Sequence, residues 1–189
     1  MQMLVKDIVK ACNGVLLCGD PETVVTSVET DSRLIEPEAL FVPIIGQKTD
    51  AHQYIQQTFD KGAVATLTQE HTSMEDSTHC WIYVEQTQDA LQRIATVYRN
   101  QFQVPVVGVT GSVGKTSTKE MIASVLSQKY NVLKTEGNFN NEIGLPLTIF
   151  KIREQHEVAV LEMGISEFGE MHRLAEMAYP DICVITNIG

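Results

Sequence analysis

The strongest chemical pattern in this sequence is a glycine-containing loop between an apolar run and a helix-like run, over residues 106–126 (VVGVTGSVGKTSTKEMIASVL). Glycines allow the backbone to curl so that successive N–H groups point inward, toward an anion. The N-terminus of the following helix adds a partial positive charge at the same place. The pattern therefore predicts a phosphate-binding loop, in which Lys115 reaches the terminal phosphates and the Thr116 hydroxyl holds Mg²⁺.

The loop departs from the strict phosphate-loop pattern G-x-x-x-x-G-K-[ST] at its first glycine. Val109 stands at that position, and Gly108 comes one residue early. What remains is T-G-x-x-G-K-T, which follows a buried-type strand and opens a helix, the placement that a phosphate loop needs. The alternative is a glycine-rich turn with an exposed lysine. The residues that we expect around the bound phosphates are Thr110, Gly111, Ser112, Val113, Gly114, Lys115, Thr116 and Ser117.

A carboxylate follows another buried-type strand, where a metal partner of the phosphate loop is expected. Glu162 comes directly after the apolar run V-A-V-L. Ligands in open α/β sheets bind at the carboxyl ends of the strands, so we expect Glu162 to hold Mg²⁺. The alternative is a strand-end acid that is only solvated. We expect its side chain to lie at the strand end and outside the core, so that a change to Gln would not affect folding.

The elements that must position these residues follow from the apolar periodicity. From Val104 onward, strands and helices alternate as they do in a parallel α/β sheet. The strand before the loop is apolar almost throughout, which is typical of a buried parallel strand. In this part we expect strands over 104–110, 131–135, 157–163 and 181–189, helices over 119–129 and 168–178, and a polar turn over 136–146.

The N-terminal part has the pattern of a smaller α/β region. It predicts helices over 4–12 and 51–63, the second stopped by Gly62, strands over 23–33, 39–45, 63–68 and 81–85, and a loop over 70–78. A long helix over 87–102 follows, with one apolar face made by Leu91, Ile94, Ala95 and Tyr98. We place a domain boundary near residue 85, with one domain over 1–84 and an incomplete phosphate-loop, parallel-sheet domain over 85–189.

The composition argues against several function classes. The 189 residues include 14 Lys and Arg against 24 Asp and Glu, which gives a formal net charge of −10. Nucleic acids and anionic membranes attract clustered positive charge, so neither is an expected partner. The sequence shows no transmembrane run and no secretory signal. The four scattered cysteines, Cys12, Cys18, Cys80 and Cys183, indicate reduced thiols in a cytoplasmic protein.

Four stretches together resemble the Mur ligases of bacterial cell-wall synthesis. They are 30–55 (TDSRLIEPEALFVPIIGQKTDAHQYI), 108–121 (GVTGSVGKTSTKEM), 135–150 (TEGNFNNEIGLPLTIF) and 161–189 (LEMGISEFGEMHRLAEMAYPDICVITNIG). The modified loop T-G-x-x-G-K-T is similar to that family's own version. One departure is Ala51, because the family's D-G-H reads Asp50-Ala51-His52 here.

The resemblance implies an ATP-dependent amide ligase that uses Mg²⁺ and an acyl phosphate, with a UDP-substrate domain before the ATPase domain. Within the family, the chain looks most like the branch that joins D-Ala-D-Ala to UDP-MurNAc-tripeptide. The alternatives are the sister branch that adds the third amino acid and a non-catalytic UDP-substrate-binding fragment. A phosphate-loop kinase or a GTPase-like switch would leave the turn at 137–144 without a role. Because the family has three domains, we expect this chain to be an inactive N-terminal fragment. We also expect it to be a monomer.

The resemblance also implies roles for individual residues. Lys115 and Glu162 would be catalytic, and residues 110–117 would surround ATP. Thr116 would hold the Mg²⁺ on the ATP side, and Glu162 the Mg²⁺ near the acyl phosphate. The contacts to substrate or phosphate in the turn would be Asn138, Asn140 and Asn141, although asparagines also occur in turns for their backbone angles. The uridine side would be formed by Ser32, Arg33, Asp50 and His52, with a structural ion pair as the alternative for Arg33 and Asp50.

Overall fold

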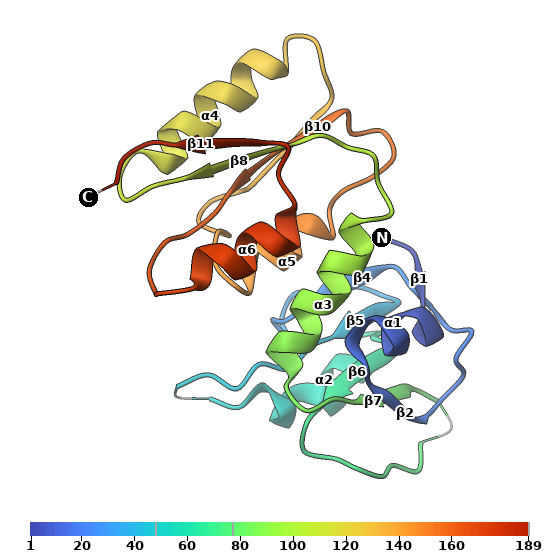
Figure 1. Ribbon diagram of the computed structural model, residues 1–189. Coiled ribbons are helices and arrows are strands. Elements are labelled where there is room, and N and C mark those ends of the chain that lie inside the picture. Colours follow the sequence, from blue (N-terminus) through green and yellow to red (C-terminus); the bar gives the residue numbers. More distant parts are fainter. Residues whose placement is uncertain (48, 77, 189) are drawn as a thin grey trace. The chain divides into compact units, whose positions relative to one another are not determined.

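The computed structural model describes residues 1–47, 49–76 and 78–188. They form two compact units, Met1–Ile94 and a second that begins at Ala95, so that helix α3 (Thr87–Arg99) contains the division between them. Figure 1 shows the course of the chain through both units. None of the helices in the described ranges has the length and apolar character needed to cross a membrane.

The first unit contains a five-stranded sheet with the strand order β2-β7-β6-β5-β4 (Figure 1). Neighbouring strands from β4 to β7 are parallel, whereas β2 pairs with β7 in the antiparallel direction. A separate antiparallel pair joins β1 to β3. The elements are β1 (Met3–Leu4), α1 (Val5–Cys12), β2 (Val15–Cys18), β3 (Val24–Val25), β4 (Ser27–Glu29), β5 (Ala39–Phe41), the 3-10 helix η1 (Ala51–Tyr54), α2 (Ile55–Asp60), β6 (Ala65–Thr68) and β7 (Cys80–Tyr83).

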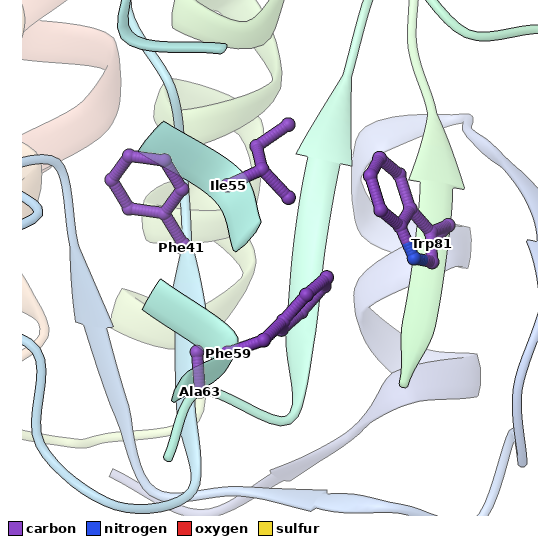
Figure 2. Packing of buried hydrophobic residues seen from close by; sticks show 5 residues of the cluster. All are labelled: Phe41, Ile55, Phe59, Ala63 and Trp81. Atoms are coloured by element: carbon purple, nitrogen blue, oxygen red, sulfur yellow. The ribbon is translucent and has the colours of Figure 1, made fainter. Parts of the chain in front are cut away.

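Aromatic and aliphatic side chains form a buried cluster between α2 and the strands of the first unit (Figure 2). Its members are Phe41, Ile55, Phe59, Ala63 and Trp81, each at most 6% exposed. Phe59 from α2 meets Trp81 from β7 edge to face, with ring centroids 5.5 Å apart. Aromatic pairs favour this geometry over a face-to-face sandwich. The cluster therefore holds α2 against the sheet.

The second unit contains a four-stranded sheet in which every neighbouring pair is parallel, with the order β11-β8-β10-β9. The predicted parallel α/β sheet is thus confirmed. Figure 1 shows α4 on one face of this sheet and α5 and α6 on the other. The elements are β8 (Val106–Thr110), α4 (Lys115–Leu126), β9 (Val132–Lys134), α5 (Gly144–Ile149), β10 (Val158–Glu162), α6 (Glu170–Ala178) and β11 (Ile182–Ile185).

The core under α4 explains why β8 and β10 are almost entirely apolar. Both strands lie in the middle of the sheet, and all of their residues are buried. Val109 and Val160 are fully buried and pack with Ala123 of α4 in one cluster. A parallel strand covered by helices on both faces needs apolar side chains in both directions. The carboxyl ends of these two strands therefore lie side by side at one edge of the sheet.

The predicted strand over 23–33 is wrong in one respect, because the structure divides it into two strands. β3 pairs with β1, whereas β4 pairs with β5 in the five-stranded sheet. Between them, the Thr26 N–H donates to the carbonyl oxygen of Glu38 at 3.0 Å. The chain changes its pairing partner at this residue, and an apolar pattern contains no information about which neighbour a strand will bond.

The predicted polar turn over 136–146 ends earlier than expected, because α5 begins at Gly144. Asn141 Oδ1 accepts the backbone N–H groups of Ile143 at 3.1 Å and of Gly144 at 2.8 Å, and so starts the helix. Pro146 lies in the first turn, where its missing N–H costs no helical hydrogen bond. A helix of 6 residues is too short for its apolar period to show in the sequence.

Candidate functional site

The phosphate loop lies between the end of β8 and the start of α4 (Figure 1). Gly111 and Gly114 have positive φ angles of 131° and 88°. A Cβ at Gly111 would lie 2.3 Å from Thr186 Oγ1 and 2.8 Å from two backbone atoms of Asn187, so only glycine fits there. Lys115 Nζ donates to the Gly111 carbonyl oxygen at 2.6 Å. The lysine thus lies over the loop, where it would meet an anion held by the loop N–H groups.

The loop is open to solvent along most of its length. The exposed residues are Ser112, Val113, Gly114, Thr116 and Ser117, whereas Thr110 and Gly111 are buried and Lys115 is half-buried. The Ser112 N–H donates to the Asn187 carbonyl oxygen at 3.0 Å, which ties the loop to the segment after β11. The eight predicted residues thus form one continuous segment that is accessible after Gly111, and their contact with phosphate stays a prediction.

The side chain of Glu162, at the end of β10, reaches Thr116 at the end of the glycine loop. Its Oε1 accepts hydrogen bonds from Thr116 Oγ1 at 3.2 Å and from Asn140 Nδ2 at 2.8 Å. Its own backbone N–H donates to Thr135 Oγ1 at 2.9 Å. The residue is only 1% exposed, so the expectation that its side chain lies outside the core is wrong. The reason is that the segments after β9 and the start of α4 cover the strand end on both sides.

Lys119, which the sequence pattern does not single out, lies beside Glu162. Its Nζ donates to the Thr135 carbonyl oxygen at 2.7 Å, and it lies 3.6 Å from Glu162 Oε2 and 3.1 Å from Glu120 Oε1. The residue is 0% exposed. A signal for it exists in the spacing, because positions three apart on a helix share a face, and Lys119 is three residues after Thr116.

The residues at this strand end fit a magnesium ion. Thr116 Oγ1 and Glu162 Oε1 lie 3.2 Å apart and are both oxygen atoms. Mg²⁺ prefers oxygen ligands and is usually held by one or two protein carboxylates together with substrate phosphates and water. A hydroxyl and a carboxylate beside a phosphate loop form such a set of donors.

The three asparagines of the predicted turn have different environments. Asn140 donates to Glu162 Oε1, as described above. Asn141 uses its side-chain oxygen to start α5, which is the turn role that was the alternative for it. Asn138 is exposed. The structure thus brings Asn140 into contact with Glu162, one of the two predicted metal ligands, and the substrate contacts of all three asparagines stay a prediction.

In the first unit, Ser32 and Arg33 lie at a surface pocket of about 480 Å³. Its lining residues are Thr30, Asp31, Ser32, Arg33, Ala51, Tyr54 and Gln57. Arg33 makes an ion pair with Asp31, with Nη2 2.6 Å from Oδ2. The hydrogen bonds from the Arg33 side chain lower the pKa of Asp31 to about 2. Arg33 is therefore in an ion pair, but its guanidinium is mostly exposed and can contact a ligand.

Asp50 and His52 form a pair of their own. His52 Nδ1 lies 2.6 Å from Asp50 Oδ1, and His52 Nε2 accepts the Gln69 N–H at 3.3 Å. Burial raises the pKa of Asp50, but the hydrogen bonds from the backbone and ring of His52 outweigh it, so the pKa is lowered. Both ring nitrogens are occupied, and the imidazole is buried. Among the described residues, these two are not in the lining of the pocket at Ser32.

Two family models match the chain. Residues 24–105 match the model described as "Mur ligase family, catalytic domain", and residues 109–189 match "Mur ligase middle domain". A curated relative, the UDP-N-acetylmuramoyl-tripeptide–D-alanyl-D-alanine ligase of Bacillus subtilis (strain 168), is 45% identical over 186 residues, which are 98% of this chain and 41% of that protein. The chain thus spans about two fifths of the length of this relative.

Solved structures of similar proteins have the same fold. MurF from Acinetobacter baumannii superposes with a TM-score of 0.90 at 30% identity, over 100% of this chain and 42% of that one. MurF ligase from Thermotoga maritima, in complex with ADP, gives a TM-score of 0.78 at 36% identity, over 86% of this chain and 38% of that one. A nucleotide is therefore bound by one of the proteins that this chain is similar to.

Proposed function

This chain belongs to the Mur ligase family, and from that premise we propose that it supplies the nucleotide-binding and uridine-binding parts of an ATP-dependent ligase. The reaction joins D-alanyl-D-alanine to UDP-N-acetylmuramoyl-tripeptide. The observation that carries the proposal is the meeting of Thr116, Asn140 and Glu162 at the mouth of the phosphate loop. The choice of substrates is supported by the name of the relative that is 45% identical.

The reaction needs ATP because a carboxylate is a poor electrophile until one of its oxygens becomes a leaving group. The peptide carboxylate and the γ-phosphate are both negatively charged, so the site must neutralise charge as they approach. Lys115 and the backbone N–H groups in the first turn of α4 supply positive charge and hydrogen-bond donors at a fixed position. Donors that are placed before the reaction stabilise its transition state more than mobile water does.

In this proposal Thr116 and Glu162 hold Mg²⁺, and Asn140 keeps the Glu162 carboxylate directed toward the loop. When bound, the ion supplies positive charge to the transferring phosphoryl group. The ion would be held by the Glu162 carboxylate and the Thr116 hydroxyl oxygen. Glu162 is the last residue of β10 and Thr116 lies in the first turn of α4, so a helix and a strand, not a loop, hold both side chains.

We place the uridine nucleotide in the first unit, at the pocket beside Ser32 and Arg33. Arg33 offers an exposed guanidinium to an anionic diphosphate. Asp50 and His52 would act by fixing the adjacent η1 turn, because the Asp50 carboxylate accepts the His52 N–H at its start. Titration with UDP should move the amide signals of Ser32 and Arg33 in NMR spectra, and the absence of any response in residues 1–94 would contradict this placement.

The test of the ligase activity uses the full-length protein with ATP, UDP-MurNAc-tripeptide and D-Ala-D-Ala, with mass spectrometry of the product. We expect the pentapeptide adduct together with ADP and phosphate. A matched reaction offers UDP-MurNAc-dipeptide and single amino acids instead. Product in that second reaction alone would assign the protein to the branch that adds the third amino acid. Binding of UDP-MurNAc-tripeptide without any product would leave only the non-catalytic function.

A further inference from the structure

The buried lysine beside the site has a charge that the proposed function does not use. Lys119 is 0% exposed, and long charged side chains are almost never fully buried unless they are paired. Two carboxylates are close to its Nζ, Glu120 at 3.1 Å and Glu162 at 3.6 Å. Glu120 is half exposed and also pairs with Lys134. Glu162 is therefore the only buried carboxylate among the ion pairs of Lys119 in the described residues.

The two oxygen atoms of the Glu162 carboxylate face different partners. Oε1 faces the phosphate loop, where Thr116 and Asn140 donate to it. Oε2 is buried, has Lys119 as its ion-pair partner at 3.6 Å, and accepts no hydrogen bond from the described residues. The lysine is itself held in place, because its Nζ donates to the Thr135 carbonyl oxygen at 2.7 Å. The carboxylate is thus directed by contacts on both of its sides.

We infer that Lys119 is a positioning residue that keeps Oε2 of Glu162 turned inward, so that Glu162 offers only Oε1 to the metal ion. The inference rests on the proposed function, in which Glu162 is a metal ligand. A carboxylate that binds through one oxygen suits Mg²⁺, which demands near-octahedral geometry with few protein ligands. Ca²⁺ accepts six to eight oxygens and often takes both oxygens of one carboxylate. Lys119 therefore makes the site selective for Mg²⁺ over Ca²⁺.

The experiment measures the dissociation constants of Mg·ADP and Ca·ADP by calorimetry for the full-length protein and three variants. Lys119→Gln removes the charge but keeps an amide that can donate to the Thr135 carbonyl oxygen. Lys119→Arg keeps the charge. Lys134→Gln is the matched control, because Lys134 is half exposed and pairs with Glu120 without reaching Glu162. Circular dichroism before each titration checks that the variant is folded.

We expect the wild-type protein to prefer Mg·ADP. Loss of an outer partner of a metal ligand typically weakens metal binding by roughly 10- to 100-fold. We expect Lys119→Gln to lose at least about tenfold in affinity for Mg·ADP and little in affinity for Ca·ADP, so that the ratio of the two constants shifts toward Ca·ADP. Lys119→Arg should keep most of the preference, and Lys134→Gln all of it. A lysine that only supports the fold would weaken binding of both complexes equally. If the metal were instead held at Oε2, removal of the Lys119 charge in Lys119→Gln would tighten the binding of both Mg·ADP and Ca·ADP.

Equal weakening of both complexes in Lys119→Gln, or tighter binding of both, would overturn the inference while leaving the proposed function intact. Equal affinity of the wild-type protein for Mg·ADP and Ca·ADP would also overturn it, and this comparison needs no variant to fold. Failure of the wild-type protein to bind Mg·ADP at all would instead refute the proposed function.

Discussion

Replacement of Glu162 by Gln tests whether the buried ion pair between Lys119 and Glu162 also stabilises the fold of the second unit. The side chains of Lys119 and Glu162 are 1% and 2% exposed and 3.6 Å apart. Loss of one partner of a buried ion pair costs about 3–5 kcal/mol, because the other charge stays buried without compensation. Glu120 remains 3.1 Å from Lys119 and compensates in part. We therefore expect a loss at the lower end, about 3 kcal/mol.

The assay is urea unfolding followed by far-UV circular dichroism, since the only tryptophan, Trp81, lies in the first unit. With a dependence of about 1–3 kcal/mol per molar urea, the midpoint should fall by roughly 1–3 M. The control is Glu136→Gln, which removes an exposed carboxylate paired with Lys151 and should change stability by less than about 1 kcal/mol. The double variant Glu162→Gln, Lys119→Met should recover part of the loss, because neither charge is left unpaired.

Two results would refute this reasoning. One is a loss of less than about 1 kcal/mol in Glu162→Gln, which would mean that the pair contributes no more than a surface ion pair does. The other is a double variant that is no more stable than Glu162→Gln alone.

Three further predictions concern the loop and the first unit. Lys115→Ala in the full-length protein should lower the kcat of ligation by roughly 100- to 1000-fold, because it removes a preorganised charge; a near-normal kcat would exclude this role. Gly111→Ala should lower the melting temperature, since φ is 131° and the new Cβ would lie 2.3 Å from a hydroxyl oxygen. The control Gly137→Ala should have a smaller effect, because no atom lies within 4 Å of its new Cβ. Equal losses of melting temperature in the two variants would contradict the steric argument. Burial raises the pKa of Asp76, but the hydrogen bonds that its carboxylate accepts outweigh burial and lower this pKa from 3.8 to about 2. The ionised Asp76 therefore stabilises the folded state above pH 3.8, and this stabilisation is lost as the pH falls through 2. Asp76→Asn should flatten that part of the acid unfolding curve followed by Trp81 fluorescence, and an unchanged slope would contradict the lowered pKa.

Features that depend on a few consecutive residues could be predicted from the sequence. A glycine loop between a strand and a helix follows from glycines, a lysine and a threonine between an apolar run and a helical one, and the structure places this loop between β8 and α4. The apolar face of α3 over Leu91, Ile94, Ala95 and Tyr98 is buried as predicted. Gly62 ends α2 with a φ of 106°, because glycine takes that angle without a steric cost. These features are set by local backbone freedom and by apolar period.

Features that depend on which segments become neighbours could not be predicted. Val24 and Ser27 are three positions apart in one apolar pattern, but they enter different sheets. The sequence also contains no measure of how far a side chain at a strand end is covered, so Glu162 was expected outside the core. Burial of that carboxylate depends on segments near Thr116, Thr135 and Asn140 that pack around it.

The order of residues along the chain was enough to predict a glycine loop between a strand and a helix, a parallel α/β sheet, and an acid at the end of a neighbouring strand. Three features follow from the packing of distant segments: Glu162 is buried, Asn140 rather than Asn141 contacts it, and Lys119 lies beside its inner oxygen. The physical reason is that backbone conformation is governed by adjacent residues, whereas charge pairing depends on distance through space. That distance is set by the packing of α4 against β9 and β10, which brings residues 119 and 162 within 3.6 Å.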